Sequence, residues 1–315
     1  MTQTAISDNF KKMHRSVCEH APAKINLHLK VGKRRADGFH NIESIFQKVN
    51  LYDELLTEMA DINYTCQVVS PDFCLPQENT LTSAYKAFCE CTGVSFGVRV
   101  TLNKNIPSGA GMGGGSSDAA AMLRCMEALS GIKLSAEQKQ ECAAKIGSDV
   151  FFFLSDEADK TAAIVTGRGE NVRYITPRKD LFIVLVSPGV HSSTKEAYSL
   201  VDSYFSGTAA DCTSLAELEA DYQKPCHKWI FYNSFTAPLK EKYPEIDNAL
   251  QDMRSVNAGF ADMTGSGSVV YGVFASRREA EYAEAQLSKK WSWCKTVTTE
   301  CLEDICRLQR FVSVK

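Results

Sequence analysis

A glycine-rich segment in the first half of the sequence has the composition of an anion-binding loop. Five of the seven residues in 109–115 are glycine, Pro107 precedes them, and an alanine-rich apolar run follows. Glycines let a backbone approach a ligand closely, and a helix N-terminus adds the positive end of its dipole. The chemistry indicated is therefore phosphate binding, with a flexible connector as the weaker alternative.

The polar residues just after the glycines have two interpretations. Ser116 and Ser117 stand where the loop gives way to the apolar run, so either hydroxyl could cap the helix or contact a phosphate and its Mg²⁺. Asp118 is expected in the first helical turn, where its negative charge would interact favourably with the helix dipole rather than contact an anionic ligand.

The spacing of the glycines limits the class of phosphate site. No Gly-Lys-Ser/Thr follows them, so this is not a Walker loop and a lysine must come from elsewhere. Gly109, Gly111 and Gly114 match the dinucleotide pattern GxGxxG. A nicotinamide-binding fold also needs a second strand ending in an acid about twenty residues on, and a capped helix is predicted there instead. A dehydrogenase is the weaker alternative.

The elements before the loop decide which side chains can reach it. Residues 21–32 alternate strictly, which predicts a half-buried strand with Lys24 and Asn26 side by side on its open face, together with His28 and Lys30. An Asp-Gly turn at 37–38 and a strand over 43–55 follow. A capped helix is expected over 79–93 and an alternating strand over 94–107.

The rest of the chain mixes strands and helices. A helix with a C-terminal stop at Gly131 follows the loop, and a second helix begins at a Ser135–Gln138 capping box and ends at Gly147. Strands are predicted at 161–167, 181–189 and 268–274, and helices through 214–254 and over 277–290. Because this order shows no regular βαβα alternation, it favours an α+β fold, with domains at 1–160 and 161–315.

Composition excludes several function classes. The chain has 315 residues, 44% of them hydrophobic, and a formal charge of −3, which is typical of a globular protein without a nucleic-acid footprint. The first twenty residues contain no apolar signal region and no apolar run is long enough to span a bilayer, so we expect no membrane association and a cytoplasmic protein. The twelve cysteines form no CxxC pair, which favours reduced thiols over disulfides or zinc.

Three stretches in this order resemble the GHMP kinase superfamily, named for galactokinase, homoserine kinase, mevalonate kinase and phosphomevalonate kinase. They are PAKINL at 22–27, PSGAGMGGGSSDAA at 107–120 and TGSGSVVYGVF at 264–274. Within the superfamily, RADGFHNIESIFQ at 35–47 is the most discriminating stretch. Together with GSDVFFFL, PGVHSSTKEAY and YPEI, it is similar to the branch that phosphorylates a cytidine diphosphate-linked methylerythritol in the non-mevalonate isoprenoid pathway.

The resemblance implies a fold and a reaction. The expected fold has an N-terminal domain like domain 2 of ribosomal protein S5 and a ferredoxin-like C-terminal domain, with the active site between them. The expected reaction moves the γ-phosphoryl group of ATP, bound with Mg²⁺, to an alcohol of the small-molecule substrate. A monomer or homodimer is expected. Another GHMP alcohol kinase, of homoserine or mevalonate type, and a non-catalytic sensor remain as alternatives.

The resemblance also implies roles for individual residues. Lys24 matches the active-site lysine and Asp149 the aspartate that takes the proton from the substrate hydroxyl. The positions expected to hold the ATP phosphates are Pro107, Ser108, Gly109, Ala110, Gly111, Met112, Gly113, Gly114, Gly115, Ser116 and Ser117. The positions expected at the substrate are Asn26, Phe39, His40, Thr194, Tyr198, Gly265, Ser266 and Gly267, with the aromatic residues stacking on the base.

The sequence departs from the family pattern at four places. Phe151 stands where a proline is usual, and Met112 replaces a leucine of similar volume. Ser234 and Thr236 replace two acids, which puts the contribution of the helix at that point in doubt.

Overall fold

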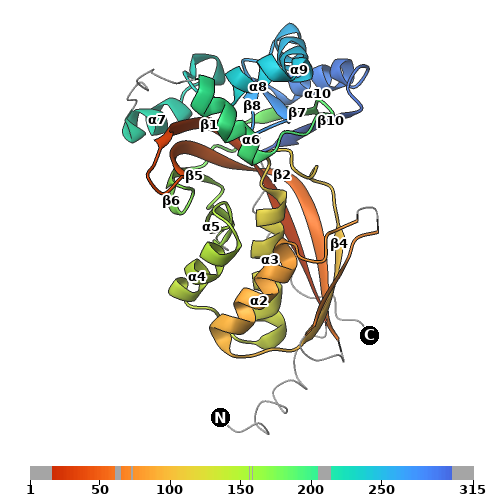
Figure 1. Ribbon diagram of the computed structural model, residues 1–315. Helices are drawn as coiled ribbons and strands as arrows, with labels where there is room; N and C mark the ends of the chain where they lie inside the picture. Colours follow the sequence, from red (N-terminus) through yellow and green to blue (C-terminus); the bar gives the residue numbers. More distant parts are fainter. Residues whose placement is uncertain are drawn as a thin grey trace, which may run out of the picture.

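The computed structural model describes residues 16–60, 65–71, 74–155, 157, 159–204 and 214–299, so the first fifteen residues of the polar leader lie outside it. The strands form two sheets (Figure 1). The chain passes from one sheet to the other between Tyr174 and Phe182. The expected α+β class is confirmed, and the domain division at residue 160 stays a proposal.

The first sheet is organised around one long strand, β2. Its strands are β1 (Ser16–Arg34), β2 (His40–Ala60), β3 (Cys66–Val69), β4 (Gly97–Asn103), β5 (Ala162–Gly167) and β6 (Asn171–Tyr174). Strand β1 pairs antiparallel with β2 along most of its length. Strands β5 and β4 pair antiparallel with successive parts of β2, and only the β3–β4 pair is parallel.

Four helices pack beside this sheet (Figure 1). They are α2 (Thr80–Thr92), α3 (Gly114–Ser130), α4 (Ala136–Ile146) and α5 (Val150–Phe153). The predicted bounds of α2 and α4 and the predicted end of α3 are confirmed, because Asn79 and Ser135 each form a capping box and Gly131 ends α3 in the left-handed region. The apolar stripe of α3, including Met122 and Met126, is fully buried.

The second sheet carries the remaining helices. Its strands are β7 (Phe182–Ser187), β8 (Phe260–Met263), β9 (Val270–Phe274) and β10 (Trp293–Thr298), in the antiparallel order β10-β7-β9-β8. The helical elements are α6 (Thr194–Tyr204), α7 (Leu215–Tyr222), the 3₁₀ turn η1 (Cys226–Lys228), α8 (Thr236–Lys242), α9 (Pro244–Ser255) and α10 (Arg277–Leu287). This β-α-β-β-α-β order is ferredoxin-like, as expected.

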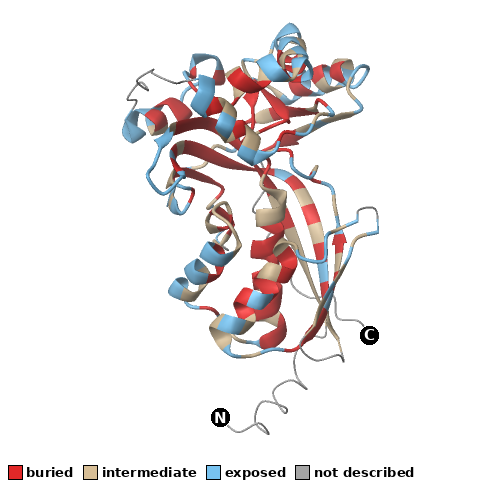
Figure 2. Cartoon of the chain, viewed as in Figure 1, coloured by how far each residue is buried: buried red, intermediate tan, exposed pale blue. Residues whose placement is uncertain are grey.

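Strand β1 corrects the expectation of a half-buried strand. Residues 23–31 are buried on both faces, including Lys24 and His28 (Figure 2). The backbone of Leu29 bonds to Tyr232 and Ser234, so the second half of the chain lies against β1. The alternation of apolar and polar residues distinguishes the two faces of the strand. It does not reveal that other parts of the chain cover both faces.

Two further properties concern the whole described chain. No helix in the described ranges combines the length and apolar character needed to cross a membrane. The cysteines described there are free thiols, as at Cys125 and Cys142.

Candidate active site

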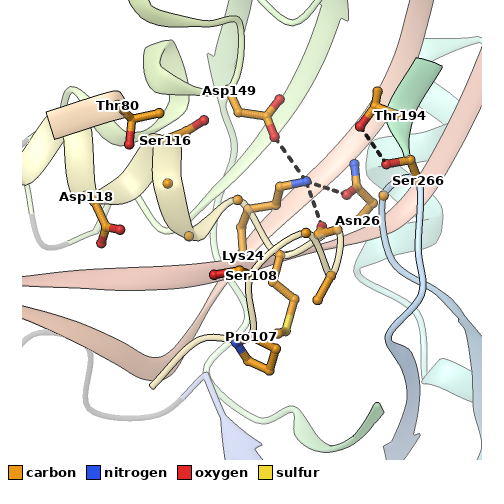
Figure 3. Close-up of a pocket in the computed structure, with 18 of the residues that line it drawn as sticks. Lys24, Asn26, Thr80, Pro107, Ser108, Ser116, Asp118, Asp149, Thr194 and Ser266 are labelled. Carbon is orange, nitrogen blue, oxygen red and sulfur yellow. Dashed lines mark hydrogen bonds and ion pairs between the residues drawn. The ribbon is translucent and has the colours of Figure 1, made fainter. Parts of the chain in front are cut away.

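A pocket of about 600 Å³ lies where the glycine loop meets β1 and the loops of the second half. From the first half it takes Lys24, Asn26, Asp149 and the loop residues 107–116. From the second half it takes Thr194, Tyr198, Gly265 and Ser266. Figure 3 shows Lys24 at its centre, with Asp149 on one side and Asn26 on the other. The structure thus brings together residues that are far apart in the sequence.

The glycine loop joins β4 to the N-terminus of α3. Gly113 is the N-cap, with a φ of 68°, and no side chain caps the helix. A Cβ at Gly113 would lie 3.0 Å from the Lys24 side chain, so glycine keeps the loop against β1. Neither Ser116 nor Ser117 is therefore a capping residue. Ser116 lines the pocket, whereas Ser117 is fully buried outside the lining and its Oγ has no partner among the described residues.

Lys24 is a buried cation whose donors are all used. Its Nζ donates to Asn26 Oδ1 at 2.6 Å and to the Gly111 carbonyl at 3.2 Å, and it lies 3.3 Å from Asp149 Oδ2. It also lies 4.5 Å from the centre of the Phe46 ring. The side chain is 4% exposed, so this set of partners offsets the cost of desolvating the charge.

Asp149 presents a carboxylate to the pocket. It is the N-cap of α5 but its side chain makes no capping bond, and it stays 32% exposed. The carboxylate is thus open to a ligand on one side and held by Lys24 on the other. Tyr198 lies nearby: burial, with a smaller effect of Asp149, raises the pKa of Tyr198 to about 12, which keeps its phenol neutral.

Asn26 and Thr264 link the two glycine loops through β1. The Asn26 backbone N–H donates to Thr264 Oγ1 at 2.9 Å, and the Thr264 hydroxyl in turn donates to the Gly111 carbonyl at 3.2 Å. The Asn26 side chain donates to Ser44 Oγ. Thr264 is fully buried and immediately precedes Gly265, so the second glycine loop is fixed against the first.

A buried charge cluster beneath the loop was not foreseen from the sequence. Lys104 forms ion pairs with Asp53 and Asp118, and Asp53 also accepts from the N–H groups of Asn105 and Ile106. Helix α3 begins at Gly114, so Asp118 lies beyond the first turn and pairs with Lys104, contrary to the expected role at the helix dipole. Burial raises the pKa of Asp118 to about 7, although Lys104 opposes the shift. The sequence feature that could have indicated this cluster is Lys104, a lysine shortly before the glycine loop.

The residues expected at the substrate fall into two groups. Thr194 Oγ1 and Ser266 Oγ are 3.1 Å apart at the pocket, and Tyr198 packs on Phe235. His40 is buried outside the lining: its Nδ1 bonds to the Gly32 carbonyl and its ring stacks on Tyr198. The remaining two, Phe39 and Gly267, also lie outside the pocket lining, and Phe39 is 50% exposed.

The four departures from the family pattern are accommodated. Met112 is buried, and Phe151 packs partly buried on the short helix α5. Ser234 Oγ accepts from the Val31 N–H, and Thr236 Oγ1 donates to Asp262. Asn233, just before them, donates to the carbonyls of Met263 and Gly265 and so supports the second glycine loop.

Arg168 and His191 also line the pocket, and the sequence analysis missed both. Arg168 is at the tip of the β5–β6 turn, and His191 packs against Gly109. Arg168 lies outside the stretches that carry the resemblance, and His191 lies inside one of them, PGVHSSTKEAY, without an implied role, so their place at the pocket is visible only in three dimensions.

Comparisons with known proteins agree with this architecture. The family model of the GHMP kinases N terminal domain matches residues 79–157, and that of the GHMP kinases C terminal domain matches residues 215–292. The first match contains the glycine loop and Asp149, and the second contains Thr264 and the second glycine loop.

Two relatives that match most of the chain have the same name. A 4-diphosphocytidyl-2-C-methyl-D-erythritol kinase of Treponema pallidum subsp. pallidum is 43% identical over 284 residues, covering 88% of this chain and 96% of the relative. The enzyme of that name from Thermotoga maritima is 38% identical over 255 residues, covering 80% of this chain and 90% of the relative.

Solved structures give the same fold. A crystal structure of 4-(cytidine 5'-diphospho)-2C-methyl-D-erythritol kinase superposes with a TM-score of 0.73 at 30% identity, over 89% of this chain and 99% of that one. A homoserine kinase from Cytophaga hutchinsonii has a TM-score of 0.64 at 16% identity, over 91% of this chain and 95% of that one, and supports the fold alone.

Proposed function

The chain belongs to the 4-diphosphocytidyl-2-C-methyl-D-erythritol kinase family of GHMP kinases, and from this premise we propose how its own residues perform the reaction. The protein transfers the γ-phosphoryl group of ATP to the 2-hydroxyl of 4-diphosphocytidyl-2-C-methyl-D-erythritol. The products are ADP and the 2-phosphate of the acceptor. The observation that carries the assignment of roles is the 3.3 Å ion pair between Lys24 and Asp149 inside the pocket.

The glycine loop holds the nucleotide phosphates. Its backbone meets the N-terminus of α3 at Gly113, where unpaired N–H groups and the helix dipole favour an anion. Lys104, anchored by Asp53 and Asp118, supports the loop from below. Phosphoryl transfer depends mainly on positioning and charge stabilisation, and this rigid loop supplies the positioning.

Asp149 accepts the proton of the attacking hydroxyl. Its carboxylate is partly exposed in the pocket and free of capping bonds, so an alcohol can donate a hydrogen bond to it. Lys24 fixes that carboxylate through the ion pair and places positive charge between it and the Gly111 carbonyl of the phosphate loop. The same cation stabilises the negative charge on the migrating phosphoryl group.

The acceptor approaches from the side of the second half. Thr194, Ser266 and Asn26 present polar groups at that wall of the pocket, and Tyr198 adds an aromatic face. We assign Phe39, on the turn between β1 and β2, to stacking on the cytosine.

Mg²⁺ would be held at the pocket together with the nucleotide. Among the described residues no group of three or more acidic, cysteine or histidine side chains could hold a metal ion. The residues fit a nucleotide-borne ion: Ser116 lines the pocket and would offer a hydroxyl oxygen, the buried Oδ1 of Asp118 has no partner among the described residues, and phosphates and water would supply the other ligands. When bound, the ion neutralises charge on the phosphate oxygens. We also propose that the protein works in the cytoplasm as a monomer or homodimer.

The experiment that tests the function is ADP release across a panel of alcohols. Purified protein with ATP and Mg²⁺ is given 4-diphosphocytidyl-2-C-methyl-D-erythritol, homoserine or mevalonate, and we expect turnover with the first alone. The matched control is Asp149→Asn, which keeps the shape of the site but removes the base. Equal turnover with homoserine or mevalonate would contradict the acceptor assignment.

A further inference from the structure

Arg168 is placed at the pocket by a tight turn. It lies between Gly167, with a φ of 73°, and Gly169, with a φ of 124°. Its N–H donates to Glu170 Oε2 at 2.5 Å, and the Gly169 N–H donates to the Thr166 carbonyl. The backbone of this turn is thereby fixed, so the guanidinium extends from a defined point on the pocket wall.

Arg168 differs from the two lysines that line the pocket in its ion pairing. Of the lysines and arginines that line it, Lys24 is in an ion pair with Asp149, and Lys104 is in ion pairs with Asp53 and Asp118. Arg168 is exposed and has no ion pair with any side chain in the described ranges. An unpaired cation on the wall of a nucleotide pocket can take an anionic group of a ligand without losing a protein partner.

The contact that Arg168 does make is with an aromatic ring. Its guanidinium carbon lies 4.1 Å from the centre of the Phe39 ring, and Phe39 is 50% exposed. Guanidinium groups stack on aromatic faces and keep their N–H donors free at the edge. Arg168 therefore spans from the ring assigned to the base to the pocket that holds Asp149.

We propose that Arg168 binds the diphosphate of the acceptor and so selects a nucleoside diphosphate-linked alcohol over one without the diphosphate. The inference rests on the proposed function, in which the base stacks at Phe39 and the hydroxyl meets Asp149. The diphosphate joins those two ends of the acceptor and must lie between them, where the planar fork of Arg168 can bind its oxygens in pairs.

Inhibition by fragments of the acceptor tests this assignment. Cytidine, CMP and CDP are measured as competitors of the acceptor at saturating ATP, for the wild type, Arg168→Met and Arg168→Lys. In the wild type, CDP should bind about ten- to a hundredfold more tightly than cytidine, the range of a charge-assisted hydrogen-bonded pair. Arg168→Met should remove most of that ratio while the inhibition constant of cytidine changes less than about threefold. Arg168→Lys should retain part of it.

The control and the contrary outcomes are distinct. Arg173→Met removes a cation of the same hairpin that pairs with Glu219 at 2.8 Å outside the pocket, and its CDP-to-cytidine ratio should stay at the wild-type value. If Arg168→Met weakens cytidine and CDP equally, or neither, Arg168 only packs on Phe39 and the proposal is wrong. If the wild type binds neither compound, the acceptor class itself fails, and the Arg168 assignment fails with it.

Discussion

Gly111 and Thr264 pack so closely that a Cβ added at Gly111 would lie 2.0 Å from the Thr264 carbonyl oxygen. Gly265 is as tightly placed, because its own Cβ would lie 2.7 Å from the Gly111 carbonyl oxygen. The two glycine loops come from opposite halves of the chain, and their backbones are in direct contact. Small residues are thus required here for contact between the loops as well as for ligand approach.

Gly111→Ala should separate these loops and lower both stability and activity. Its φ of 77° costs an alanine roughly 1–2 kcal/mol, and the contact at 2.0 Å forces the Thr264 backbone to move as well. Urea unfolding and kcat measure the two effects. Gly189→Ala is the matched control, since Gly189 has a φ of 78° and nothing within 4 Å of its added Cβ. Equal losses in the two variants would show that the contact between the loops has no energetic role.

Asp149→Asn should lower kcat by about a hundred- to ten-thousandfold, the usual contribution of a general base. The side chain makes no capping bond and is 32% exposed, so the fold and the KM for ATP should change little. Steady-state kinetics with both substrates, beside a thermal unfolding curve, separates these effects. A kcat within a few-fold of the wild type would remove Asp149 from the role of base.

Thr264→Val should destabilise the protein by about 1–3 kcal/mol, since the buried Asn26 N–H loses its acceptor and valine keeps the shape of the side chain. We expect kcat to fall as well, because Asn26 positions Lys24. Thr264→Ser restores the hydroxyl and should recover most of kcat. If valine and serine variants have the same kcat, the hydroxyl does not position the site.

Asp118 should make stability depend on pH. Burial raises its pKa in the folded protein to about 7, above the ordinary value of 3.8, so folding favours the protonated form. The resulting stability is fully present below about pH 4 and is lost as the pH rises through 7. The free energy of unfolding of the wild type relative to Asp118→Asn should therefore fall between about pH 4 and pH 7. Parallel curves for the two proteins would contradict this.

The elements of the fold were readable because their signals are local. The capping boxes at Asn79 and Ser135 and the stop at Gly131 lie within a few residues of the helix ends that they define. Short elements with weak patterns, such as β3 and β8, escaped prediction because four-residue strands carry too little alternation to be detected.

The site was readable in part. Lys24 and Asp149 came from the resemblance, and no spacing rule joins a strand near the N-terminus to a turn so far along the chain. Lys104, Arg168 and His191 were missed because their places depend on which turns meet at the pocket. The burial of His28 escaped for the same reason, since its cover comes from Phe231 and Tyr232. Which residues of one half are covered by the other half depends on the tertiary structure, and local sequence patterns do not predict it.

The burial of β1 on both faces ties catalysis to global unfolding. Lys24 lies within a long antiparallel pairing with β2 and beneath the first glycine loop, and the second half of the chain covers the same strand at Asn26 and Leu29, so no small local opening can release it. Heat or denaturant should therefore abolish turnover and tertiary structure in one step. A partly opened form that keeps its fold but has lost its working site should not accumulate.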